Sequence, residues 1–171
     1  DHAVLGRAYR AGSRGEGGLM PFLATGNAQE ALVDAVVAAL KGDTSLAALV
    51  TGTYGHVPQA QRTNYPYVRV SDPLLMQDDF GGMGIGGGKV LFSIDTWGGN
   101  GSAKGPHPVR VILARMLVVL ERRDLALVGF KLAGGSLHCT ESRVIDEPDP
   151  DMPEQLLYHG HQAWEALVDE A

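Results

Sequence analysis

The chain has 171 residues, 44 % of them hydrophobic and 20 % charged, which predicts one folded domain and excludes a disordered protein. Its formal net charge of −6 excludes a general nucleic-acid coat, because affinity for phosphate backbones comes from Lys and Arg. One cysteine allows no intramolecular disulfide, and no segment approaches the ~20 consecutive apolar residues of a membrane helix, so we expect cytoplasmic synthesis and no membrane partner.

The N-terminal segment differs in composition from the rest of the chain. Residues 11–18 read Ala-Gly-Ser-Arg-Gly-Glu-Gly-Gly, which cannot bury apolar surface. We therefore expect a flexible N-terminal tail over residues 1–26, followed by a single domain over residues 27–171.

Two helical segments open this domain. Apolar residues recur at helical spacing up to Leu40, which predicts a first helix capped by Asn27 and ended by Gly42. Asp43 is suited to cap a short second helix over residues 45–50.

Two strands with a loop between them are expected next. Residues 68–71 alternate as a short strand does, and residues 72–88 are predicted to form a loop. Lys89 to Trp97 is the clearest strand: Val90, Phe92, Ile94 and Thr96 point to one face, and Leu91, Ser93, Asp95 and Trp97 to the other.

The last part of the chain predicts one more helix and further strands. An amphipathic helix is expected over 106–123, with a short strand over 125–130. Residues 138–145 and 155–168 indicate a final strand pair, although the second segment is long enough that we expect its end to change type. The predicted fold class is α+β: a two-layer sandwich of a mostly antiparallel sheet with two helices on one face.

The glycine-rich segment matches a nucleotide-binding motif in sequence but not in its expected structural context. Residues 82–87 match G-x-G-x-x-G, but a loop precedes them and a strand follows, whereas dinucleotide binding needs a strand before and a helix after. The position that binds magnesium in a phosphate loop is occupied by Val90. We therefore predict no nucleotide cofactor.

Two histidines form a weak metal-site pattern. His159 and His161 lie two apart, so on a strand they project from the same face, and His138 or Cys139 on a neighbouring strand would add a ligand. No carboxylate lies nearby at ligand spacing in the sequence, so we predict no metal site. Cys139 and His138 are adjacent and point to opposite faces of a strand, which argues against a catalytic Cys–His pair.

The segment from Asp78 to Gly88 combines glycines with bare apolar side chains. Such a loop cannot pack these side chains on itself, so either a partner covers them or they fold back on the protein's own core. With two tryptophans from the later strands, the predicted protein-contact residues are Asp78, Asp79, Phe80, Met83, Ile85, Trp97 and Trp164.

Several segments occur in the order found in one known family. These are the paired helices of residues 31–50, Val57-Pro-Gln, Tyr65-Pro-Tyr-Val-Arg-Val, the strand Val90-Leu-Phe-Ser-Ile-Asp-Thr-Trp, the helix of 106–123 and a closing hairpin with an acidic loop. Over residues ~28–168, in an order typical of one connected topology, the chain resembles the tail-completion proteins that include siphophage tail terminators.

This resemblance implies a structural virion protein of a bacteriophage tail or neck, assembled in the host cytoplasm, with no catalytic role and no cofactor. It implies a homohexameric ring that caps the tail tube, stops its polymerisation and joins it to the head. The implied partners are further copies of the chain, the major tail tube protein and the head–tail connector or stopper protein. DNA would pass through the lumen without specific binding. Residues 141–171, which hold nine acids and one base, would suit the lining of such a channel.

Two other classes remain open. The chain would also suit another neck or connector adaptor protein with a similar fold and no active site. The second alternative is a metal-dependent enzyme that uses Cys139, His159 and His161.

Overall fold

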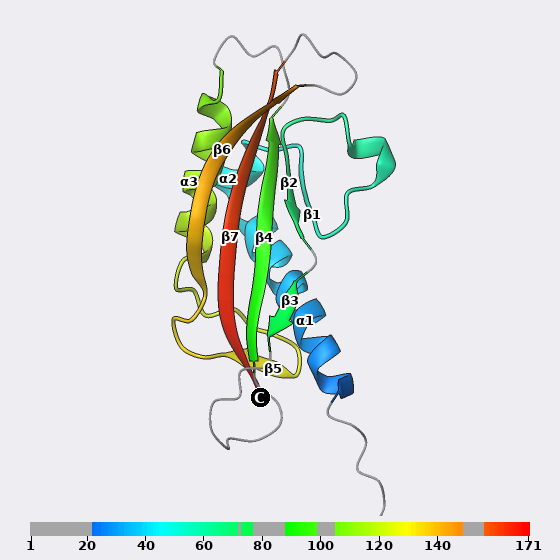
Figure 1. The fold of residues 1–171 in the computed structure, drawn as a ribbon, viewed down its shortest axis with the longest axis vertical. Coiled ribbons are helices and arrows are strands. Elements are labelled where there is room, and N and C mark those ends of the chain that lie inside the picture. Colours follow the sequence, from blue (N-terminus) through cyan, green and yellow to red (C-terminus); the bar gives the residue numbers. More distant parts are fainter. Residues whose placement is uncertain (1–21, 72, 77–87, 99–104, 149–155) are drawn as a thin grey trace, which may run out of the picture.

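The computed structural model describes residues 22–71, 73–76, 88–98, 105–148 and 156–171 (Figure 1). Within these ranges the chain forms an α+β fold. Its elements are α1 (Phe22–Gly42), α2 (Thr44–Ala47), β1 (Gly52–Tyr54), the 3-10 helix η1 (Gln59–Gln61), β2 (Tyr67–Val70), β3 (Leu74–Met76), β4 (Gly88–Gly98), α3 (His107–Leu120), β5 (Phe130–Leu132), β6 (His138–Pro148) and β7 (Leu156–Glu170). None of the helices described is both long and apolar enough to span a membrane.

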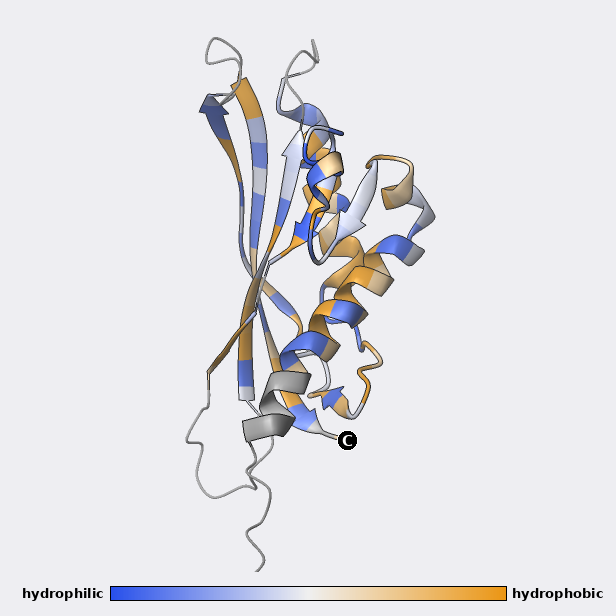
Figure 2. Ribbon diagram, turned by 90° about the vertical axis from the view of Figure 1, so that its right-hand side faces the viewer, coloured by the Kyte–Doolittle hydropathy of each residue, from blue (hydrophilic) through white to orange (hydrophobic). Residues whose placement is uncertain are grey.

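The strands form one seven-stranded mixed sheet in the order β1-β2-β4-β7-β5, with β3 beside β4 and β6 beside β7. The β1–β2 pair is parallel, and the other pairs are antiparallel. The predicted α+β class is confirmed. The predicted two-layer sandwich with a mostly antiparallel sheet is not confirmed, because the sheet is mixed and its long strands twist and bend so that it curls (Figures 1 and 2).

Several element boundaries differ from those expected. The first helix begins at Phe22, so Asn27 lies inside it and does not cap it. The last strand does not change type, because β7 pairs with β4 on one side and β6 on the other along most of its length. The strand expected at 125–130 is instead β5, with Leu127 bridging to Phe130.

The core lies between the helices and one face of the sheet. In Figure 1, α1 passes behind β4 and α3 lies behind β6; in Figure 2, hydrophobic and hydrophilic residues alternate along the long strands. This alternation follows from the two-residue period of a strand. The buried side chains that face one another are Ala28, Leu32, Val36 and Leu40 of α1; Val109, Ile112, Leu113, Met116, Val119 and Leu120 of α3; Val90, Phe92 and Ile94 of β4; and Trp164, Ala166 and Val168 of β7.

Close packing of α3 on β7 depends on a residue without a side chain. A Cβ added at Gly160 would lie 2.6 Å from a methyl group of Val109 and 2.9 Å from one of Leu113. Next to it, the buried Gln162 donates to the Leu113 carbonyl at 3.0 Å and accepts from the Trp164 indole at 3.3 Å. These polar groups are satisfied, which keeps the cost of burying them low.

The predicted cap of the second helix is confirmed. The Asp43 carboxylate accepts a 2.7 Å hydrogen bond from the Leu46 amide and also binds the Arg115 guanidinium of α3. Arg115, followed by the Leu46 amide, lowers the pKa of Asp43 to about 2. One carboxylate thus starts α2 and ties it to α3.

Candidate functional site: the outer face of the sheet

The side chains of β2, β3, β4, β7 and β6 that point away from the helices form what we call the outer face. Alternation places His159 and His161 there, because Gly160 between them packs on α3. The register then brings together residues that are far apart in sequence: Asp95 pairs with His161, and Trp97 with His159.

One row across this face is aromatic. The rings of Trp97 and His159 stack with centroids 4.1 Å apart and planes 6° from parallel. On the other side of Trp97 its cross-strand partner is Tyr67, whose ring stacks on Tyr65 at 5.8 Å. Each ring is held by neighbours on other strands or loops, so this part of the face has a fixed shape.

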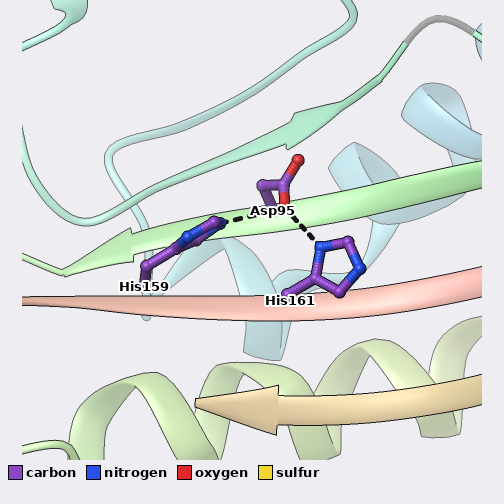
Figure 3. Close-up of side chains that lie close together, drawn as sticks. All are labelled: Asp95, His159 and His161. Atoms are coloured by element: carbon purple, nitrogen blue, oxygen red, sulfur yellow. Dashed lines mark hydrogen bonds and ion pairs between the residues drawn. The ribbon is translucent and has the colours of Figure 1, made fainter. Parts of the chain in front are cut away.

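A polar cluster joins His159 of this aromatic row to Asp95 and His161 of the next row (Figure 3). Oδ1 of Asp95 lies 3.0 Å from Nε2 of His159 and 2.8 Å from Nδ1 of His161. The remaining ring nitrogen of His159 lies 3.1 Å from a carboxylate oxygen of Glu147 on β6. The side chains of the three cluster residues are only 13–23 % exposed.

The cluster shifts the acidity of its members. Burial alone would raise the pKa of Asp95, but the hydrogen bonds and charge of the two histidines outweigh burial and hold that pKa below its ordinary value. Burial would likewise lower the pKa of His159, and the carboxylates of Asp95 and Glu147 together raise it instead. The arrangement therefore concentrates negative charge around two imidazoles, which suits it to hold either a proton or a cation.

Cys139 does not join this cluster, which corrects the alternative of a site built from Cys139, His159 and His161. Cys139 is the cross-strand partner of Trp164, a helix-facing residue, and it packs against the hydrophobic core. Its thiol donates to the Glu141 carbonyl, and burial raises its pKa. Cross-strand partners share a face, so Cys139 lies on the side of the sheet opposite the two histidines.

The sequence-predicted contact residues fall into three groups. Those of the glycine-rich loop, Asp78, Asp79, Phe80, Met83 and Ile85, lie outside the described residues. Trp97 is half-buried on the outer face. Trp164 is 1 % exposed and stacks on Phe92 in the core, so its side chain is not accessible to a partner in this structure.

Sequence reasoning missed the residue that completes the cluster and a group of exposed apolar residues. Asp95 stands 64 residues before His159, and only the β4–β7 register joins them; the available signal was the alternation that put Asp95 and Trp97 on one face. At one end of the outer face, Leu74, Met76 and Leu167 are 61 %, 45 % and 46 % exposed, and they lie around the Lys89–Glu165 ion pair, which the strand register places between them. We call these three residues the apolar end.

Comparisons with known proteins agree with this architecture. The family model "Tail completion protein gp17" matches residues 34–169, most of the chain. A chain from the structure "Virion of native gene transfer agent (GTA) particle" is similar in fold, with a TM-score of 0.64 and 23 % identity over 83 % of this chain and 97 % of that one. No curated protein sequence matches. The protein is therefore a structural, non-enzymatic component of a virion tail, and the chain belongs to the tail completion protein gp17 family.

Proposed function

We propose that this protein is a tail terminator: copies of the chain form a closed hexameric ring on the end of the tail tube and join it to the head connector. The observation that carries the proposal is the apolar end, Leu74, Met76 and Leu167, exposed in a family whose members complete tails. Exposed apolar side chains around an ion pair, here Lys89–Glu165, favour a protein partner over bare solvent exposure.

The partner that we assign to the apolar end is the neighbouring copy in the ring. A ring closes through heterologous contacts, in which one surface meets a different surface of the next copy. The long edge strand β6 is less suited to that contact, because exposed charges along it, Glu141 and Arg143, discourage open-ended strand pairing. The charged edge disfavours open-ended strand pairing, and a heterologous contact at the apolar end closes into a ring when the rotation between copies allows it.

We assign a second contact surface to the segment 77–87 because of its position in the chain. It joins Met76 of β3 to Gly88 of β4, and these two residues belong to the same end of the sheet. We therefore assign Phe80, Met83 and Ile85 to contacts with the tube protein or the next copy, with Trp97 as a further contact on the outer face. Apart from Glu147 and Glu165, which contact His159 and Lys89 on the outer face, the acidic residues of 141–171 are assigned to the lumen, where like charge would let DNA pass without binding.

The proposal is tested by the size of the assembly. In sedimentation velocity and negative-stain images, with and without purified tail tubes, we expect the wild-type chain to form six-membered rings. The double variant L74E/L167E should stay monomeric, because it adds two negative charges beside Glu165 that the single Lys89 cannot pair, and unpaired charge is costly to bury in a contact. Val118→Glu is the matched control, since Val118 on α3 is 66 % exposed and lies away from the outer face; it should leave the ring intact.

The role at the tail end is tested by capping. Purified tube protein, allowed to polymerise with the wild-type chain, should give short tubes with a ring at one end, and L74E/L167E should not limit their length. Rings that survive in L74E/L167E would contradict the assigned contact. A protein that binds the head connector and leaves tube growth unchanged would instead be a neck adaptor.

A further inference from the structure

We propose that Asp95, His159 and His161 bind one divalent transition-metal ion, with zinc as the expected ion, and that this ion joins β4 to β7 on the outer face. This goes beyond tail completion and does not depend on ring formation. The three ligands come from neighbouring strands whose register places them together.

The geometry of the cluster fits a small ion. One ligand atom from each residue lies within 4.8 Å of the others. Zinc binds nitrogen and oxygen at ~2.0–2.2 Å, so its tetrahedral ligand atoms lie about 3.3–3.5 Å apart. The two nitrogen–oxygen distances around Asp95, 3.0 Å and 2.8 Å, need to open by a few tenths of an ångström as the ion replaces the shared hydrogens. The two histidine nitrogens lie within 4.8 Å of each other and need to adopt the same ligand spacing.

Glu147 and Trp97 hold the His159 ring in a fixed orientation, as neighbours of a ligating histidine do in metal sites. The ring nitrogen of His159 that faces away from Asp95 lies 3.1 Å from Glu147, and the ring stacks on Trp97. A carboxylate behind a ligating histidine fixes its orientation and raises its basicity, as in carboxylate–histidine–zinc arrangements. Nε2 of His159 is thus directed at Oδ1 of Asp95, the same atom that Nδ1 of His161 contacts (Figure 3).

The donor set also selects the kind of ion. Two imidazoles and one carboxylate suit zinc, cobalt or nickel, whereas magnesium and calcium prefer oxygen ligands. The carboxylates of Asp95 and Glu147 together balance a charge of +2. Arg143, beside His161, is paired with Glu141 at 3.1 Å. Arg69, the cross-strand partner of Asp95, adds positive charge, so R69Q should tighten binding.

The test is a titration of the full-length chain without an affinity tag, after removal of metal with a chelator. Isothermal titration calorimetry with Zn²⁺ should show one ion per chain, and Co²⁺ should give the visible absorption band of a low-symmetry site. D95N and the double variant H159Q/H161Q should abolish both signals. E147Q should weaken zinc binding by about 10–100-fold, the usual effect of losing an orienting carboxylate.

Three controls make the outcome decisive. His56 is exposed and lies outside the cluster, so H56Q should bind zinc as the wild type does. Circular dichroism without metal should show that D95N is folded. L74E/L167E should keep the zinc affinity of the wild type, which separates failure of the ring from failure of the metal site. Zinc affinity unchanged in D95N, or equal in the wild type and H159Q/H161Q, would overturn the proposal.

Discussion

The two faces of β7 carry different kinds of contact. Toward the helices it presents Gly160, Gln162 and Trp164, all buried and packed against α3 and the core. Toward the outside it presents His159 and His161, which contact polar and aromatic groups of the neighbouring strands. Because side chains alternate, each face can change without direct loss of contacts on the other. This division can be tested by substitutions on one face at a time.

The largest effect is expected at Trp164. W164A should lower the free energy of unfolding by about 3–5 kcal/mol, because it removes a fully buried aromatic side chain and leaves a cavity. Urea denaturation followed by circular dichroism measures this. The matched change on the outer face is W97A, which should cost less, because it removes an aromatic stack worth about 0.5–1.5 kcal/mol and the smaller area that the half-buried Trp97 buries. Equal losses in the two variants would show that the faces do not differ in this way.

A smaller effect is expected at Gly160, where the helix meets the sheet. G160A should destabilise the fold by about 1–3 kcal/mol, because the added methyl group collides with Val109 and Leu113. The control is G134A: a Cβ at Gly134 meets no atom within 4 Å, so its denaturation midpoint should stay close to that of the wild type. If G160A were neutral, the close approach of α3 to β7 would be wrong.

The smallest effect concerns the ion pair between the helices and appears as a pH dependence. Asp43 has its pKa lowered from 3.8 to about 2, so its pairing with Arg115 stabilises the fold above pH ~4 and is lost as the pH falls toward 2. R115M removes the pair and leaves the cap of α2. Thermal melts should therefore show a wild-type advantage at pH 5 that shrinks by pH 2.5. The difference should be modest, since both side chains are partly exposed to solvent. An advantage independent of pH would contradict the assignment.

Local patterns predicted much of the fold. The alternation in residues 89–97 predicted which residues of β4 are buried, and Asp43 was identified as a helix cap. The sequence did not predict β1 and β3, because the alternation in a three-residue strand is too short to be distinguished from a loop. The length of β7 was also underestimated, since its continuity depends on partners on both sides.

The candidate site divides in the same way. The spacing of His159 and His161 was sufficient to place them on one face, because side-chain direction along a strand depends only on local geometry. The sequence could not show that Asp95 completes their cluster, that Glu147 lies behind His159, or that Cys139 faces the other way. These depend on the pairing register of strands distant in the chain, which packing of the whole core selects. The residue types and their local faces were therefore determined by sequence, and their assembly into a site by the tertiary structure.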